Sequence, residues 1–361
     1  MIQEHKWRFL NDFITRGGRP LKLFMDIVVS MDVQIRESYS ESIDGFSKNE
    51  LAKMMVLDGV FLIELFRKVG RLSPVHQDDP IFKMIWVSPL LMMDILKIEN
   101  QIPFFVLQKL YDESRTDERT LPSLIFEFYN YLVDRQPKIL KKCENLEGKH
   151  LLDLFRKSFI NTNNNGDSIR RCENAPLKLI QPATALAIKG VKFRANHQAE
   201  SFLDIEFENG ILYIPQINMD DFYSSFFLNC VAFEQCYFHC SKDITTYVVF
   251  MGCLMNTSTD ASVLSGSKII ENYFTDSETA EFFFHIGKDV AFDIKNNYLQ
   301  GLFKEVNDYC KNGWHVGWAG FIHKFYFENW PVLSALAAFM LLSLAALQTF
   351  YTVYPYYRKD K

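Results

Sequence analysis

Pro331–Phe350 reads PVLSALAAFMLLSLAALQTF, and this stretch separates the chain into a part suited to lipid and a part suited to water. No formally charged side chain occurs between Asn329 and Tyr357. A helix of about 20 residues rises about 30 Å, the thickness of the hydrocarbon core of a bilayer. The sequence therefore predicts a single C-terminal transmembrane helix over 329–357, preceded by a water-soluble body.

Aromatic side chains border this segment on both sides, as they do at the two interfaces of a membrane. They lie over 325–327 and at Trp330 before it, and from Phe350 to Tyr357 after it. The alternative interpretation is a buried core helix. Ser334 and Ala338 form one pair of small residues, compatible with dimerisation of the helix, although the oligomeric state is left open. The residues predicted for the membrane anchor are Trp330, Pro331, Leu333, Ala338, Leu341, Leu344, Phe350 and Tyr351.

The orientation of the anchor depends on two opposing signals. The basic residues over 358–361 favour a cytosolic tail under the positive-inside rule. However, the predicted anchor leaves the ribosome only after synthesis ends, and the first residues are charged where a signal peptide is apolar. We therefore expect post-translational insertion, as in tail-anchored proteins, with a cytosolic body at the plasma membrane or an endomembrane.

The composition of the 361 residues is that of a globular protein. Apolar residues make up 48 % and charged residues 23 %, and 33 Phe residues predict an aromatic core. The net charge of −5, with no long basic run, argues against nucleic-acid binding. Seven cysteines, an odd number, argue against a dense disulfide framework, so we expect reduced and mostly buried thiols.

Helical periodicity and boundary signals predict a mostly helical body. Ser47 and Glu50 form a capping box before an apolar helix over 51–69, which should be central because it is apolar nearly all round. Ser88-Pro89 predicts the start of a helix over 90–97. Trp7, Leu10 and Ile14 predict the inner face of a first helix. Further helices are predicted over 103–111, 121–134, 150–159, 220–238, 244–255 and 278–312.

A small β element interrupts the helices. Strands are predicted over 191–194, 202–208 and 211–217, and Asn209-Gly210 suits the positive φ values of a type I′ hairpin turn. The fold class is thus mostly α with a small β-hairpin or three-stranded insert (α+β). The expected parts are a helical region over 1–160, a polar linker over 161–178, a hairpin and helical region over 179–328, the anchor over 329–357 and a basic tail over 358–361.

No motif in the sequence specifies a reaction. The patterns G-x-S-x-G, G-x-G-x-x-G, H-E-x-x-H and C-x-x-C and the P-loop are absent. Cys236, His239 and Cys240 have zinc-ligand chemistry but lack a second pair at finger spacing, so we predict buried thiols at a helix end and no metal or cofactor. The stripe Phe222, Phe226, Phe227 and Phe233 is interpreted as core packing.

Four carboxylates, those of Asp58, Glu64, Asp94 and Glu99, lie within apolar sequence. Paired acids can perform general acid–base catalysis, whereas buried acids also stabilise structures by meeting backbone donors or basic partners. Glu99 is expected to cap the helix that starts near residue 103. We prefer the structural role.

Six segments together carry a family pattern: LDGVFLIELFR at 57–67, DILKIENQIPFF at 94–105, GVKF at 190–193, SFLDIEFENGILYIP at 201–215, AFEQC at 232–236 and the C-terminal stretch from 326. In this order they resemble the plant DUF247 (UPF0481) family, from about residue 4 to the C-terminus. The matching positions, interpreted as structural, are Asp58, Gly59, Glu64, Asp94, Glu99, Asn100, Gln101, Pro103, Asn209, Gly210, Glu234 and Gln235.

The resemblance implies a plant protein held by a C-terminal membrane segment, with no established enzymatic activity and no catalytic residues to transfer. Some grass members are linked to pollen–stigma self-recognition. Members usually carry more sequence before the start, and they typically have Glu, Glu and Arg where this chain has Ala185, Ser224 and Leu228. A shortened or non-functional copy is therefore a third possibility.

The leading hypothesis is a membrane-anchored recognition or signalling protein, not an enzyme, that contacts other proteins through surface loops such as 160–176. The alternative is a membrane-attached enzyme, such as a hydrolase that uses buried carboxylates. A pocket that joins Asp58, Asp94, Glu99 or His239 would favour the enzyme, and carboxylates bonded to backbone N–H groups would favour the binding protein.

Overall fold

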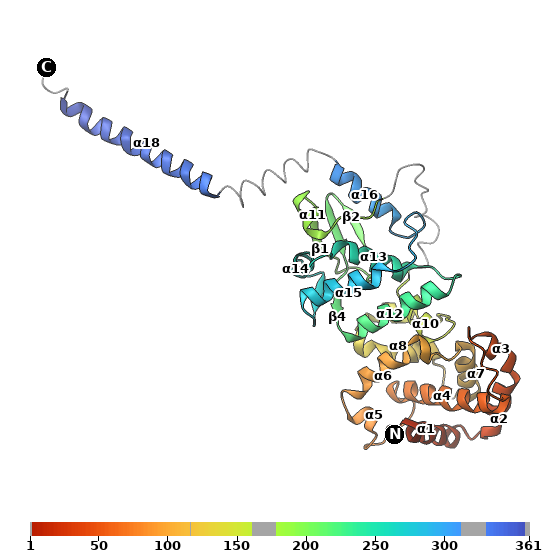
Figure 1. The fold of residues 1–361 in the computed structure, drawn as a ribbon. Coiled ribbons are helices and arrows are strands. Elements are labelled where there is room, and N and C mark those ends of the chain that lie inside the picture. The colour runs from red at the N-terminus through yellow and green to blue at the C-terminus, as the bar shows by residue number, and fades with distance from the viewer. Residues whose placement is uncertain (1, 116, 161–177, 312–329, 358–361) are drawn as a thin grey trace.

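The computed structural model describes residues 2–115, 117–160, 178–311 and 330–357. A mostly helical body is followed by one long helix that projects away from it (Figure 1). The helices are α1 (Ile2–Gly17), α2 (Leu21–Ser30), α3 (Asp32–Glu37), α4 (Lys48–Val69), α5 (Pro80–Lys83), α6 (Val87–Ile95), η1 (Ile98–Asn100), α7 (Phe104–Ser114), α8 (Leu121–Val133), α9 (Pro137–Lys142), α10 (Leu151–Lys157), α11 (Ala183–Ile188), α12 (Asp221–Cys236), α13 (Asp243–Leu254), α14 (Ser258–Gly266), α15 (Asp276–Lys288), α16 (Gln300–Lys311) and α18 (Trp330–Tyr357). The strands are β1 (Lys192–Ala195), β2 (Glu206–Glu208), β3 (Ile211–Ile214), β4 (Ile217–Met219) and β5 (Ile270–Asn272).

Helix α4 is the centre of the N-terminal part, as its apolar surface predicts. The predicted capping box is present, with the Glu50 backbone N–H bonded to the Ser47 hydroxyl and the Ser47 N–H bonded to the Glu50 carboxylate. The helix packs against α1, α2, α7 and α8. A Cβ at Gly59 would lie 2.8 Å from Leu110 Cδ1, so this glycine allows α7 to approach closely.

Two predictions for the N-terminal helices need correction. Ser88 and Pro89 lie inside the first turn of α6, and the Ser88 hydroxyl donates to the Ile81 carbonyl instead of capping a helix. Of the predicted inner face, Leu10 is buried and Ile14 is partly buried against the core, but Trp7 is 47 % exposed. The core residues of α1 are Phe9, Leu10 and Phe13.

The predicted three-stranded sheet is present with the order β1-β3-β2. Strand β1 is parallel to β3 and β2 is antiparallel to it. Asn209 and Gly210 have φ values of 51° and 77° and form the predicted turn. The pairing aligns charged residues at the two edges with one residue of β3 between them. The two rows are Lys192–Ile211–Glu208 and Arg194–Tyr213–Glu206.

Several C-terminal boundaries differ from the prediction. The predicted strand over 211–217 is divided into β3 and β4, and β4 pairs in parallel with β5, which was not predicted. Strand β2 starts only at Glu206, because the Asp204 carboxylate bonds to the N–H groups of Glu200 and Ser201 and forms a turn before it. The single helix predicted over 278–312 is two helices, α15 and α16. Helix α14 was missed although Thr257 and Asp260 form its capping box.

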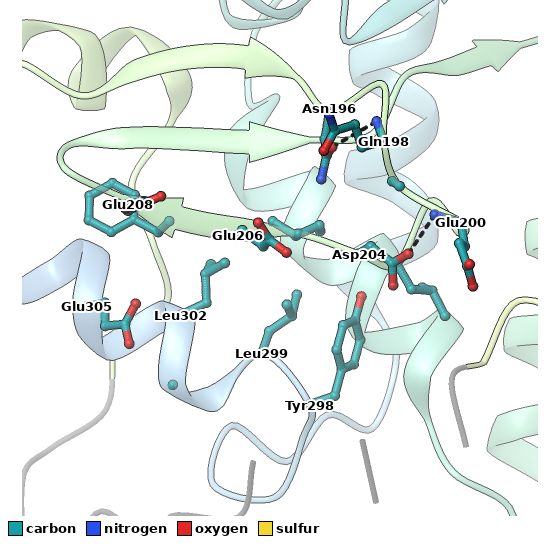
Figure 2. Close-up of a pocket in the computed structure, with 15 residues that line it drawn as sticks. Asn196, Gln198, Glu200, Asp204, Glu206, Glu208, Tyr298, Leu299, Leu302 and Glu305 are labelled. Carbon is teal, nitrogen blue, oxygen red and sulfur yellow. Dashed lines mark hydrogen bonds between the residues drawn. The ribbon is translucent and has the colours of Figure 1, made fainter. Parts of the chain in front are cut away.

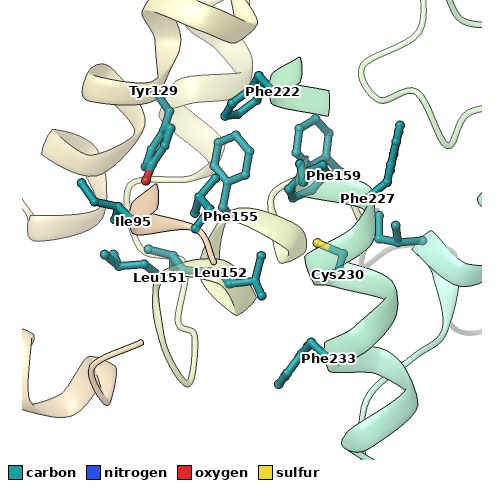
Figure 3. Packing of buried hydrophobic residues seen from close by; sticks show 14 of the residues in the cluster. Ile95, Tyr129, Leu151, Leu152, Phe155, Phe159, Phe222, Phe227, Cys230 and Phe233 are labelled. Atoms are coloured by element: carbon teal, nitrogen blue, oxygen red, sulfur yellow. The ribbon is translucent and has the colours of Figure 1, made fainter. Parts of the chain in front are cut away.

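An aromatic core joins the helices before residue 161 to those after residue 177, as the Phe content predicts (Figure 3). Phe155 of α10 contacts the rings of Tyr129, Phe159 and Phe226 at centroid distances of 4.8, 5.4 and 5.3 Å. The predicted stripe on α12 is confirmed as core, because all four phenylalanines are buried. The core thus fixes α12 against α10.

Helix α18 spans 28 residues and its described side chains are exposed, so the alternative of a buried core helix is wrong for the isolated chain. Its segment Ser334–Tyr354 is long and apolar enough to cross a membrane by length and composition. The predicted linker (except residue 178), the aromatic run over 325–327 and the basic tail lie outside the described residues.

Candidate functional site

The carboxylates singled out in the sequence are not brought together. Asp58 forms an ion pair with Lys6 at 2.6 Å, and Asp94 forms one with Lys97 at 2.8 Å, both at the surface. Glu99 is exposed in η1, so Asp94 and Glu99 do not have the apolar surroundings that were predicted. Only Glu64 is fully buried. These four acids therefore do not form one pocket.

Gln101, not Glu99, connects the helix ends in the NQIP segment. Its Nε2 donates to the carbonyl oxygens of Ile95 and Lys97 at 2.9 and 2.6 Å, and its Oε1 accepts from Leu152 N at 3.0 Å. Helix α7 has no side-chain cap, because Phe104 N donates to a backbone carbonyl at 2.7 Å. The predicted capping role of Glu99 is therefore wrong, and Gln101 joins the end of α6 to the start of α10.

The first buried ion cluster surrounds Glu64 and links α1 to α4. Arg16 binds both carboxylate oxygens, with Nη1 2.7 Å from Oε2. Arg67 Nη1 lies 3.3 Å from Oε1, and Ser73 donates at 3.0 Å. Arg67 also donates to the carbonyl of Ser114 at 3.0 Å, which attaches α7. Burial lowers the pKa of Arg67, whereas the pKa of Arg16 is raised because Glu64 outweighs the opposing effect of burial.

The second buried ion cluster surrounds Glu234 and links α10, α12 and α13. Arg156 Nε lies 2.6 Å from Oε1, and Asp153 lies 3.3 Å from Arg156 Nη1. The N–H groups of Ile244 and Thr245 donate to Glu234 at 3.2 and 2.8 Å, and the Thr245 hydroxyl donates at 2.7 Å. Burial raises the pKa of Glu234, against the opposing charge of Arg156.

Both buried carboxylates are thus engaged by arginines, and Glu234 also by backbone donors. The neighbouring Gln235 serves a similar role, because it accepts from Ala291 N at 3.0 Å and fixes the loop after α15. A fully engaged carboxylate holds elements together and has no free lone pair directed at a substrate.

The cysteine–histidine segment ends α12. Cys236 is exposed, contrary to the predicted burial, and Cys240 is half-buried with its thiol 3.1 Å from the Tyr237 carbonyl. The His239 ring packs edge-on against Tyr237. Within the described ranges, no three His, Cys, Asp or Glu side chains are grouped closely enough to hold a metal ion.

One concave surface lies between β2, the turn before it and α16, and we call it the acidic trough (Figure 2). Its volume is about 840 Å³. Its carboxylates are those of Glu200, Asp204, Glu206, Glu208 and Glu305, and no basic residue is among the described residues that line it. Leu302 of α16 and Leu299, which directly precedes this helix, form part of its apolar floor.

The acids of the trough differ in their partners. Glu200 is bound by Lys138 and Lys142, whose hydrogen bonds lower its pKa. Asp204 accepts the two backbone bonds of the turn. Glu206, Glu208 and Glu305 are exposed. The trough can therefore attract cationic groups, and its mostly buried leucines offer a small apolar surface. The alternation of Glu206 and Glu208 in the sequence could have indicated a charged strand face. The position of Glu305 beside β2 could not be predicted, because a single helix was predicted over 278–312.

The second candidate is α18, whose surface is suited to lipid. Ala338 is exposed, and Leu341, Leu344, Phe350 and Tyr351 are 57–70 % exposed. Trp330 and Pro331 form its first turn, but their side chains and that of Leu333 lie outside the described part. Hydroxyls such as that of Ser343 donate to carbonyls of their own helix, which satisfies them without water.

Comparisons with known proteins agree with the resemblance seen in the sequence. The family model DUF247, described as a plant protein of unknown function, matches residues 1–344. The UPF0481 protein At3g47200 of Arabidopsis thaliana is 36 % identical over 385 residues, which cover 100 % of this chain and 80 % of the relative. A putative UPF0481 protein, At3g02645, from the same plant is 23 % identical over 424 residues, covering 90 % and 78 %. No solved structure matches.

Proposed function

The chain belongs to the plant DUF247 family of proteins of unknown function, and from this premise we propose that it is a membrane-anchored protein that acts by contact with other proteins. The observation that carries the proposal is α18, a helix whose segment Ser334–Tyr354 is uncharged, apolar and not covered by the body. The body supplies the contact surface, and the anchor keeps the body at the membrane surface.

The energetic argument for the anchor is the size of the exposed apolar surface. Eight large apolar side chains between residues 336 and 350 are more than half exposed. Each gains about 1.5–3 kcal/mol when it is fully buried, so their exposure to water costs on the order of 10 kcal/mol. This cost is comparable to the whole stability of a domain. A bilayer removes it, and the length of the span matches the hydrocarbon thickness.

We propose the acidic trough as the contact surface on the body, in place of the polar loop that lies outside the described residues. Its three exposed carboxylates and its leucine floor suit a basic, partly apolar segment of a partner protein. The enzyme alternative lacks a supporting observation among the described residues, because Glu64 and Glu234 are engaged in ion clusters and the other acids lie apart at the surface.

Membrane anchoring is tested by carbonate extraction of the full-length chain, which we expect to remain in the membrane pellet. A chain cut after Asn329 should move to the supernatant. We also expect protease added to sealed vesicles to digest the body, because we place it on the cytosolic side. Recovery of the full-length chain in the supernatant would contradict the anchor, and a protected body would contradict only the orientation.

The contact surface is tested by proximity labelling with the anchor intact. The double variant Glu206→Lys, Glu208→Lys should no longer label the partner proteins of the unaltered chain, because its reversed charge repels a basic segment. The matched control is Glu37→Lys with Glu41→Lys, which reverses two exposed glutamates far from the trough. If both double variants label the same proteins as the unaltered chain, the trough is not the contact surface.

A further inference from the structure

Gln348 is the amide side chain of α18, and the helix does not satisfy it. Its neighbours Thr349 and Thr352 donate to carbonyl oxygens of their own helix at 2.8 and 2.6 Å. In the part of the chain that the structure describes, the Gln348 side chain has no hydrogen bond of this kind. An amide has two donors and an acceptor, and each unpaired group is costly in hydrocarbon.

The depth of Gln348 keeps its amide away from the aqueous interface. It lies six residues before the end of Ser334–Tyr354, which places it about 9 Å inside the span. Side chains on a helix lean toward its N-terminus, so the amide points toward the middle of the span rather than to the nearer interface. Gln348 therefore needs a partner within the membrane.

Helical spacing places Gln348 on the narrow face of α18. At 3.6 residues per turn, the narrow face is an arc of about 80° in which every residue of the segment Ser334–Tyr354 except Leu341 is small or polar. Its members are Ser334, Ala338, Leu341, Ala345, Gln348 and Thr352. The opposite face contains large side chains, and the rings of Phe350 and Tyr354 stack there at 5.2 Å. Large residues suit lipid, whereas small ones let a second helix approach closely.

We propose that α18 pairs with α18 of a second copy of this chain through this narrow face, with the two Gln348 amides hydrogen-bonded to each other. A second copy inserts in the same direction and to the same depth, so a two-fold axis places one amide opposite the other. The amide is self-complementary, because one Nε2 donates while the other Oε1 accepts. This inference rests on the membrane anchoring proposed above.

The experiment measures energy transfer between two differently labelled full-length copies in the same membrane. Gln348→Leu should weaken pairing about tenfold, because it removes the bonds between the helices. Gln348→Asn, which keeps an amide, should retain most of the pairing, and Ala338→Ile should reduce it by blocking close approach. The matched control is Ser343→Ala on the opposite face, where the hydroxyl already bonds to Phe339 O at 2.8 Å, and it should pair normally.

The same membranes are extracted with carbonate, which separates two kinds of failure. A chain that remains in the pellet but does not pair would overturn the pairing alone, whereas a chain in the supernatant would overturn the anchor and the pairing together. Equal pairing of the unaltered chain and Gln348→Leu would also overturn the proposal. The proposal would also be overturned if the chain did not self-associate but bound a different membrane protein, and Gln348→Leu abolished that binding. The amide would then bond to another partner.

Discussion

Glu64 and Glu234 are both buried carboxylates bound by arginine, but their two ion clusters hold the body together in different ways. Glu64 is bound by two arginines and a serine, and Arg16 among them is 24 % exposed. Glu234 is bound by one buried arginine and by two N–H groups at the start of α13. The side chain of the N-cap residue does not cap α13, and Glu234 caps this helix from α12 instead. The second cluster therefore fixes backbone, whereas the first fixes mainly side chains.

The largest effect is expected for Glu234→Ala. It leaves Arg156 buried with only its weaker partners and uncaps α13, so it should lower the free energy of unfolding by about 3–5 kcal/mol. Urea unfolding of the full-length chain in mild detergent measures the change. The exposed control Glu37→Ala should cost less than about 0.5 kcal/mol. If Glu234→Ala lowers the free energy of unfolding by less than about 1 kcal/mol, the cap that Glu234 provides for α13 does not contribute to stability as proposed.

Glu64→Ala leaves Arg67 buried without a carboxylate, but Arg16 can turn toward water and no helix loses a cap. We therefore expect a smaller cost, about 2–3 kcal/mol. The same unfolding assay gives the value. Arg16→Ala should cost less still than Glu64→Ala, since Glu64 keeps Arg67 and Ser73. The contrast between the two clusters fails if Glu64→Ala destabilises the chain as much as Glu234→Ala does.

A pH dependence should distinguish the second cluster. His150 caps α10, because its ring accepts a hydrogen bond from Asp153 N at 3.2 Å. Burial lowers the pKa of His150 from 6.5 to about 4. The positive charges of Lys149, Lys157 and Arg156 lower this pKa further, whereas the negative charge of Asp153 raises it. The folded chain therefore binds fewer protons here than the unfolded chain. Its contribution to stability is complete above pH 6.5 and is lost as the pH falls toward about 4.

With a discount for partial exposure, this loss is roughly 2 kcal/mol. His150→Asn keeps a capping side chain but does not titrate, so the unaltered chain should lose about that much more than the variant between pH 7 and pH 4. Unfolding curves at both pH values test this. Parallel losses in the two proteins would mean that His150 does not contribute.

The smallest effect is expected for Ser47→Ala, which removes a local and exposed cap. The Ser47 hydroxyl accepts from Glu50 N at the start of α4, and its loss should cost about 1 kcal/mol. Thermal unfolding is sensitive enough to detect it. A cost equal to that of Glu234→Ala would mean that a cap supplied from another helix is worth no more than one supplied by the chain itself.

The sequence predicted the features that are encoded by residues close together in the chain. The capping box at Ser47, the Asn209-Gly210 turn and the aromatic face of α12 each depend on one short segment. The fold class followed from them. The length and composition of α18 likewise follow from one uninterrupted run, whereas membrane insertion itself stays a prediction.

Features that depend on distant residues could not be predicted. Glu234 caps a helix ten residues later from a different element, and Gln101 bonds to Leu152 across 51 residues. Glu99 was assigned the capping role because it precedes the helix in sequence, but α7 obtains its bond from a backbone carbonyl. The acidic trough combines β2 with α16, and the break between α15 and α16 has no strong sequence signal.

The charge pattern of the small sheet limits how two bodies can meet. Its β1 edge carries Lys192 and Arg194, and its β2 edge carries Glu206 and Glu208. A two-fold axis always joins an edge to its own counterpart, so strand continuation between two copies would bring cations onto cations or anions onto anions. Symmetric sheet extension is thereby disfavoured, and a symmetric pair of these chains has to associate through some other element.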